Sequence, residues 1–262
     1  PALDQLKLNA AKWLAGRIDH GEIAVSGTLR HLILTVKGVA SKGNDKTERF
    51  KGPKVGAPAP ALEGFARKYG LDSSALISEG GILYAEVHSK GEPAAALLAA
   101  MIPELMKSLQ FPKFMTWEET GFKFGRPLRA ITALLGDKIV AVTVAGVKSG
   151  RAAYGHPVLA KKPAILKDPS KHAATLRQGL VIADPAERRD YLLKSLDQAT
   201  KPTGGKIDQD EALIDETVFM VEHPVPELGK LRDEHMKLPA ELLKLVMKKQ
   251  LKFFPVVTRD GL

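Results

Sequence analysis

The stretch FKFGRPLRAITALLGDKIVAVTVAGV, Phe122–Val147, predicts a pair of β-strands joined by a tight turn. Apolar residues dominate both sides of Gly136-Asp137, and a glycine next to an aspartate is a common connection between antiparallel strands. Arg126 and Arg129 stand on either side of a proline just before the first apolar run. They either bind an acidic partner or solvate the start of a buried segment, and the local sequence leaves both roles open.

Helical and strand-like segments are mixed on both sides of this stretch. Apolar spacing predicts helices over residues 3–18, 61–70, 92–109, 168–179, 185–200 and 238–254. Alternating or β-rich runs predict strands within residues 22–40, 82–91 and 180–184. Because the two kinds of element do not alternate strictly, we expect an α+β fold of mixed sheets with packed helices. We expect an N-terminal α+β body region over residues 1–156, with a second α+β region over residues 157–262 packed on it.

The composition is that of a soluble globular protein with a basic balance. The chain has 262 residues, 44% hydrophobic and 26% charged, with 39 Lys and Arg against 30 Asp and Glu. The net charge of +9 and the pI near 9.5 favour phosphate-rich partners. Cysteine is absent, which excludes disulfides, thiolate catalysis and cysteine-bound zinc. With no long apolar run and no signal sequence, we expect a cytoplasmic chain with no membrane partner.

Motifs for self-contained catalysis are missing from the sequence. There is no GxGxxG after a strand, no HExxH and no GxSxG, and TGGKI at residues 203–207 lacks the serine or threonine of a phosphate-binding loop. The seven histidines are scattered without metal-ligand spacing. We therefore predict no catalytic residue, no metal site and no cofactor in this chain. A hydrolase or transferase with an active site assembled from distant residues remains an alternative.

Basic residues gather in three segments and on the last helix. Residues 41–60, predicted to be a surface loop, carry Lys51 and Lys54, which either follow phosphates or only keep the loop soluble. An ion pair with Glu118 is the alternative to phosphate binding for one of Arg126 and Arg129. On the last helix, a solvated face explains Lys244, Lys248, Lys249 and Lys252 more simply than RNA contact does.

The stretch VKSGRAAYGH, residues 147–156, combines cations, glycines and an aromatic ring. Its candidate RNA-binding residues are Lys148, Arg151, Tyr154 and His156. Glycine allows a phosphate to approach the backbone closely, and a tyrosine ring stacks on a base. An ordinary connection with incidental charge is the alternative, and the coincidence of these residue types favours phosphate and base contact.

Several stretches together resemble the N-terminal part of the β subunit of bacterial heterotetrameric glycyl-tRNA synthetase. In chain order they are GTLRHLIL (27–34), KGP (51–53), GFARKYG (64–70), FPKFMTW (111–117), FGRPLRAITALLGD (124–137), SGRAAYGH (149–156), VIADPAERR (181–189), EHPVPELGK (222–230) and LPAELL…FFPV (238–256). Each is a weak signal alone, but their shared order and spacing over residues 25–257 are specific.

The resemblance implies a part in attaching glycine to tRNA(Gly), an aminoacyl-tRNA synthetase function of protein biosynthesis. It implies that the α subunit carries the class II ligase site with ATP and Mg²⁺, and that this chain is a non-catalytic, RNA-binding body fragment. It also implies a fold similar to part of the phenylalanyl-tRNA synthetase large subunit. Both chain ends look cut, which agrees with a fragment. The alternative is a module that docks the α subunit or braces the rest of the β subunit without touching RNA.

Overall fold

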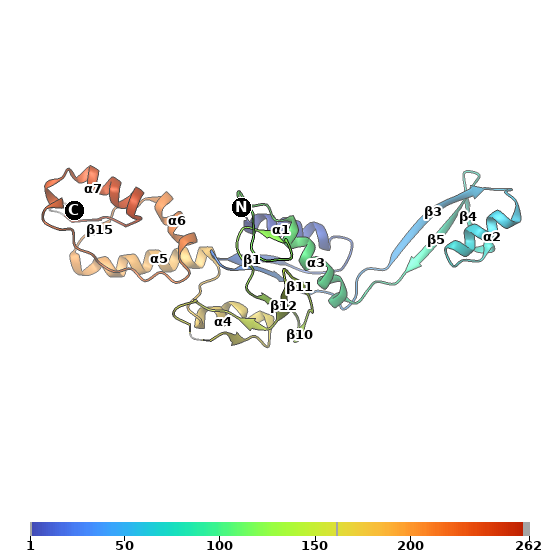
Figure 1. Ribbon diagram of the computed structural model, residues 1–262, viewed down its shortest axis with the longest axis horizontal. Coiled ribbons are helices and arrows are strands. Elements are labelled where there is room, and N and C mark those ends of the chain that lie inside the picture. Colours follow the sequence, from blue (N-terminus) through green and yellow to red (C-terminus); the bar gives the residue numbers. More distant parts are fainter. Residues whose placement is uncertain (1, 161, 259–262) are drawn as a thin grey trace.

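A computed structural model describes residues 2–160 and 162–258. Figure 1 shows three parts in a row, a central body with an arm at one end and a helical unit at the other. No helix among the described residues is both long and apolar enough to span a bilayer. Small, mostly antiparallel sheets are interspersed with helices, which confirms the predicted α+β class. The division of the chain at residue 156 stays a prediction.

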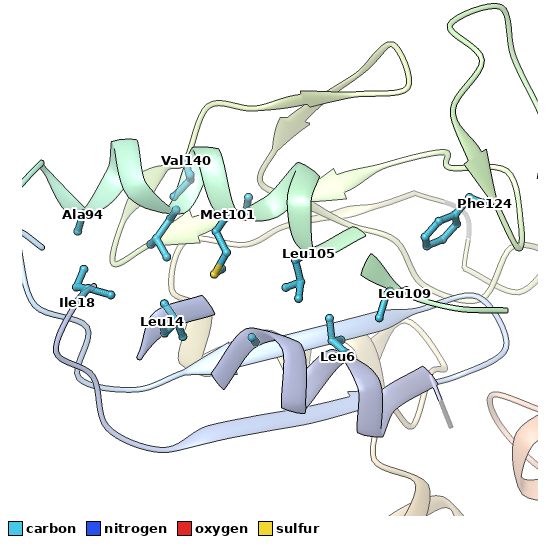
Figure 2. Close-up of a cluster of buried hydrophobic side chains, with 12 residues drawn as sticks. Leu6, Leu14, Ile18, Ala94, Met101, Leu105, Leu109, Phe124 and Val140 are labelled. Atoms are coloured by element: carbon cyan, nitrogen blue, oxygen red, sulfur yellow. The ribbon is translucent and has the colours of Figure 1, made fainter. Parts of the chain in front are cut away.

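The central body is built on two helices and a hairpin. Its longer elements are α1 (Ala2–Leu14), β1 (Ile23–Gly27), β2 (Leu32–Val36), α3 (Ala94–Ser108) and α4 (His172–Gln178). Leu6, Ala10 and Leu14 recur at every fourth position of α1 and are buried, so this helix presents one apolar face. That face meets Met101 and Leu105 of α3, and Figure 2 shows the resulting cluster.

Short strands follow α3 and carry the stretch that predicted local β-structure. They are β6 (Met115–Thr116), β7 (Lys123–Phe124), β8 (Ile131–Thr132), β9 (Leu134–Leu135), β10 (Lys138–Ile139), β11 (Thr143–Val144), β12 (Val147–Gly150), β13 (Ala152–Ala153) and β14 (Ala164–Ile165). Leu135 pairs with Lys138, which confirms Gly136-Asp137 as a two-residue turn. The strands are shorter than the sequence predicts, and β12 pairs in parallel with β8 rather than in the same hairpin.

The arm consists of β3 (Lys46–Lys54), α2 (Ala59–Lys68), β4 (Ile77–Glu79) and β5 (Ile82–Ser89). The prediction of a loop over residues 41–60 is wrong for β3, which pairs along its length with β5. Most β3 side chains are charged and exposed, so the strand lacks the apolar alternation that would have revealed it. Tyr69 directly follows α2, and its ring stacks on the ring of Phe50 in β3, with the centroids 4.4 Å apart. This contact holds the helix against the sheet.

The helical unit contains α5 (Pro185–Thr200), β15 (Lys206–Ile207), α6 (Glu211–Met220), α7 (Ala240–Val246) and β16 (Val256–Val257). Asp184 accepts hydrogen bonds from the first-turn amides of α5, as an N-cap residue should. The predicted strand over residues 180–184 is wrong. The Ile182 amide donates to the Glu222 carbonyl and the Ala183 carbonyl accepts from Gly27, so this segment is shared between two neighbours and forms no ladder.

Candidate nucleic-acid interface

Arg126 and Arg129 lie on an exposed connection whose ends are fixed. Phe124, before them, is buried at one end of the cluster shown in Figure 2. A side chain at Gly125 would place its Cβ only 2.9 Å from the Phe111 ring, so the backbone passes close to the core here. Ile131, after the arginines, packs against the same cluster. Both arginine side chains are exposed on an anchored backbone.

The pairing of β8 with β12 brings a second group of cations alongside. Because Ile131 lies opposite Ser149 in a parallel register, Arg129 falls beside the start of β12, where Lys148 is exposed. Arg151 follows β12, and its Nη2 donates to the Asp137 carbonyl at 2.9 Å. The backbone of Arg129 therefore lies next to the start of β12, which carries Lys148 and is followed by Arg151, although these segments are separate in the sequence.

The ion pair considered for Arg126 or Arg129 does not form. The carboxylate of Glu118 accepts from the Thr120 hydroxyl and amide and from the Phe122 amide, and these bonds lower its pKa. Within the described residues, Arg126, Arg129 and Lys148 have no carboxylate partner. Residues 111–156 hold seven Lys and Arg against three Asp and Glu, a net charge of +4. The positive field of this region is therefore left uncompensated.

Tyr154 and His156 play different local parts. Tyr154 is half exposed, and its carbonyl oxygen lies 3.0 Å from Nε2 of His31. Nδ1 of His156 accepts from the Val158 and Leu159 amides, so its proton is on Nε2. The His156 amide also donates to the Gly179 carbonyl at 2.7 Å. The tyrosine ring is thus available to a ligand, whereas the histidine organises a turn.

Lys51 and Lys54 lie away from the other candidates. Both are exposed on β3 of the arm, while Lys148 is on β12 of the central body, and Figure 1 shows these strands in different parts of the molecule. The residues proposed from the sequence are therefore divided between two surfaces.

Three of the four lysines singled out on the last helix form ion pairs, contrary to the simplest interpretation of the sequence, whereas Lys249 is exposed as that interpretation predicts. Nζ of Lys248 lies 3.1 Å from Asp208 and 3.7 Å from Asp210, and Lys244 lies 3.8 Å from Asp208. Lys252 pairs with Glu216 at 2.8 Å. Lys244 of α7, and Lys248 and Lys252 beyond it, are therefore compensated by acids of the helical unit.

A fully buried arginine joins the helical unit to the central body. Arg188, on α5, donates from Nε to the Val218 carbonyl at 2.6 Å and from Nη2 to the Gly27 carbonyl at 3.1 Å. Its Nη1 donates to the carbonyls of Ile182 and Ala183. Burial lowers the pKa of Arg188, while the charges of nearby carboxylates raise it. One planar side chain thus satisfies backbone carbonyls from β1, α6 and the segment before α5.

A buried carboxylate completes this junction. Glu222 is 2% exposed and accepts from the Thr28 hydroxyl at 2.6 Å, from Arg30 at 2.8 Å and from Nδ1 of His31 at 3.0 Å. Burial alone would raise the pKa of Glu222, but the hydrogen bonds from these three residues, together with the electrostatic attraction of His31, outweigh burial and lower the pKa to about 2. His31 therefore connects Glu222 to the Tyr154 carbonyl and so to the basic loop, residues 147–156.

Sequence reasoning missed Arg188 and Glu222 as individual residues. One signal was present, because Arg188, Leu192 and Leu196 recur at every fourth position and share the buried face of α5. The quoted stretches 27–34, 181–189 and 222–230 all meet at this junction. Among the described residues, no group of three histidines or carboxylates is placed to hold a metal ion.

Comparison with known proteins identifies the family. A family model described as "Glycyl-tRNA synthetase beta subunit" matches residues 1–262. The glycine–tRNA ligase β subunit of Anaeromyxobacter dehalogenans is 38% identical over 99% of this chain and 39% of its own length. That of Desulforamulus reducens is 33% identical over 100% and 39%, and that of Halothermothrix orenii is 34% identical over 94% and 37%.

The chain spans about two fifths of the length of these relatives. Several of them are more than 30% identical to this chain, and the family model matches it from end to end. These findings confirm the resemblance that the short sequence matches indicated. This chain belongs to the glycyl-tRNA synthetase β-subunit family.

Proposed function

We propose that the chain supplies a non-catalytic, tRNA-binding surface to a glycyl-tRNA synthetase and so supports attachment of glycine to tRNA(Gly) by an α subunit. One observation carries the proposal: Arg126, Arg129 and Lys148 are exposed, anchored and without carboxylate partners among the described residues. Arg151 extends this group, although one of its N–H groups is engaged by the Asp137 carbonyl. Arginine and lysine held in this way bind phosphate without first breaking an internal ion pair.

The contrast with other cations of the chain strengthens this assignment. Arg49 lies 3.0 Å from Glu79 and 3.2 Å from Glu86, and Lys42 lies 3.0 Å from Asp45. Lys244 of α7 and Lys248 just after it are compensated in the same way. Among the described residues, Arg126, Arg129 and Lys148 instead stay free of carboxylates, in a region (residues 111–156) of net charge +4, as a polyanion-binding surface requires. On the arm, Lys51 and Lys54 offer a second phosphate contact that is separate from the first.

Filter binding of tRNA(Gly) over a salt series tests the proposal. The triple variant Arg126→Gln, Arg129→Gln, Lys148→Gln should bind weakly, and its log K against log salt slope should be shallower by about 2 to 3 than that of wild type. The control variant Lys37→Gln, Lys42→Gln, Lys252→Gln removes the same charge from lysines that form exposed ion pairs and should change the slope little. Equal losses in both variants, or weak binding by wild type that is insensitive to salt, would contradict the proposal.

A docking role is the second candidate function, and α7 favours it. Lys244 of this helix is paired with Asp208, while Leu242, Leu245 and Val246 are 45%, 56% and 40% exposed. Phe253, just beyond, is 56% exposed. A helix with a paired lysine and exposed leucines is suited to burial against another protein surface.

Co-purification with a glycyl-tRNA synthetase α subunit distinguishes the two functions. If docking is the function, Leu242→Asp with Leu245→Asp should abolish co-purification, while the triple variant of Arg126, Arg129 and Lys148 should leave it intact. If tRNA binding is the function, the same two sets of variants should give the reverse result in the filter assay. Loss of neither activity in either set would exclude both assignments of these surfaces.

A further inference from the structure

An exposed run of large apolar side chains lies on the β6–β7 hairpin, which precedes Arg126 and Arg129 in the chain. Phe114, Met115 and Trp117, on and beside β6, are 38%, 46% and 41% exposed. Their neighbours Phe111 and Phe124 pack into the core of the central body instead. The other aromatic residues of this hairpin are in the core, whereas these large side chains remain at the surface. They are therefore available to a ligand.

The exposed rings are held in place rather than free to turn. Nε1 of Trp117 donates to the Phe124 carbonyl at 3.0 Å, which fixes the indole against its own hairpin. Phe114 meets Phe111 edge to face, with ring centroids 5.8 Å apart at 80°. Phe111 in turn lies 4.9 Å from Phe124, centroid to centroid. A ring fixed in this way loses little conformational entropy when a planar group stacks on it.

Three cations whose side chains have no partner among the described residues lie on the same hairpin as these rings or directly next to it. Lys113 precedes Phe114, Lys123 lies opposite Thr116 in the β6–β7 pair, and Arg126 follows Phe124 by two residues. All three cations are exposed, and none has a hydrogen-bond or ion-pair partner among the described residues. A stacking surface with phosphate-binding groups beside it matches both halves of a nucleotide, the flat base and the charged backbone. A protein partner would favour an apolar centre depleted of charge instead.

We propose that the β6–β7 hairpin binds an unpaired nucleotide of RNA, with a base stacked on Trp117 and its phosphates held by Lys123 and Arg126. The inference rests on the proposed tRNA-binding function and gives it a second component, which recognises single-stranded RNA rather than charge alone. Bases in a duplex are already stacked, so only an unpaired segment can occupy the indole face.

Tryptophan fluorescence tests the stacking directly. The chain has two tryptophans, so Trp13→Phe leaves Trp117 as the only indole. A short single-stranded RNA should quench the emission of this variant, whereas a duplex of equal length should not. Trp117→Ala should weaken binding of the single strand about five- to a hundred-fold, the range for loss of one stacked base, and should leave duplex binding unchanged. Trp117→Phe removes the hydrogen bond to Phe124 but keeps a ring, and should retain most of the affinity.

The outcomes separate this inference from the proposed function. If tRNA binds with a steep salt dependence but Trp117 is not quenched and Trp117→Ala binds normally, the stacking site is overturned while the basic surface stands. If no RNA binds to wild type, both fail. If an α subunit quenches Trp117 and single-stranded RNA does not, the hairpin is a protein contact and the inference is wrong. Unfolding curves of each variant should match wild type, so that lost binding is not lost folding.

Discussion

Nη2 of Arg188 donates to the carbonyl of Gly27 over 3.1 Å, although 161 positions separate the two residues in the chain. Gly27 ends β1 in the central body and Arg188 begins the second turn of α5, so this bond crosses from one part of the molecule to the next. The other donors of Arg188 bind carbonyls of the segment before α5 and of α6. The hydrogen bonds of this fully buried cation therefore help to fix the position of the helical unit.

Replacing Arg188 should destabilise the fold more than replacing its neighbour. Arg188→Lys retains the charge but cannot reproduce the planar fork, so several buried carbonyls lose their donors at about 1–3 kcal/mol each. We expect the free energy of unfolding in urea to fall by about 3 kcal/mol or more. Arg189→Lys is the matched control, because Arg189 pairs with Glu211 and Asp215 at the surface and its loss should cost under about 1 kcal/mol. Similar losses in the two variants would refute the role of Arg188.

Glu222 should make the stability of the chain depend on acid pH. Its folded pKa of about 2 lies below the ordinary 4.5, so its contribution is present above about pH 4.5 and is lost as the pH falls toward 2. The shift corresponds to roughly 3 kcal/mol at about 1.4 kcal/mol per pH unit. Glu222→Gln should lower stability at pH 7 and flatten the fall between pH 5 and pH 2, measured by urea unfolding. Glu227→Gln, at an exposed position nearby, should reproduce the wild-type curve.

The buried junction shows which features the local sequence can predict and which it cannot. Local signals predict the helices over residues 92–109 and 185–200 and the turn at Gly136-Asp137 because spacing, proline and glycine act within a few positions. Arg188 and Arg189 are adjacent and look alike in sequence. Only the carbonyls of distant segments make the first a buried junction and the second a surface ion pair.

The candidate nucleic-acid interface likewise combines features that the sequence predicts with features that only the folded chain determines. Arg126 and Lys148 were recognisable as basic residues near glycine and proline, but the lack of an ion pair between Arg126 and Glu118 depends on Glu118 turning back onto Thr120. The ion pairs of Lys248 and Lys252 depend on Asp208, just after β15, and on Glu216 of α6, so they are invisible in the sequence of the last helix. Charge content was predictable, whereas charge compensation is a property of the folded chain.

The β11–β12 turn should be improvable by a single substitution. Ala145 has a φ of 51° and Gly146 a φ of 74°, and a left-handed conformation costs a residue with a Cβ about 1–2 kcal/mol. Ala145→Asn produces the Asn-Gly pair preferred in this type of two-residue turn and should raise stability by about 0.5–1 kcal/mol. Gly146→Ala should act with the opposite sign and lower stability by about 1 kcal/mol. Thermal unfolding measures both, and a change of the same sign in the two variants would contradict the argument.

Gly155 should be intolerant of any side chain, because the basic loop packs backbone to backbone at this point. A Cβ on Gly155 would lie 2.5 Å from the Gly179 carbonyl oxygen and 2.8 Å from the Ala160 Cβ. The His156 amide donates to the same Gly179 carbonyl, so the clash would also disturb that hydrogen bond. We expect Gly155→Ala to cost about 1–3 kcal/mol of unfolding free energy. Since the clash displaces the loop that holds Tyr154, tRNA affinity should also fall if the loop contacts RNA.

Gly150→Ala provides the comparison on the same loop. No atom lies within 4 Å of a Cβ built on Gly150, and its φ is not positive, so the substitution should change stability by under about 0.5 kcal/mol. Both variants add one methyl group to a glycine of the same segment, but only the one at Gly155 creates a clash. Urea unfolding and filter binding of the two therefore distinguish the effect of the clash from the effect of replacing a glycine. Equal effects on stability would mean that the contact between Gly155 and Gly179 does not position the loop. A stability loss confined to Gly155→Ala with unchanged tRNA binding would show that RNA contact ends before Tyr154.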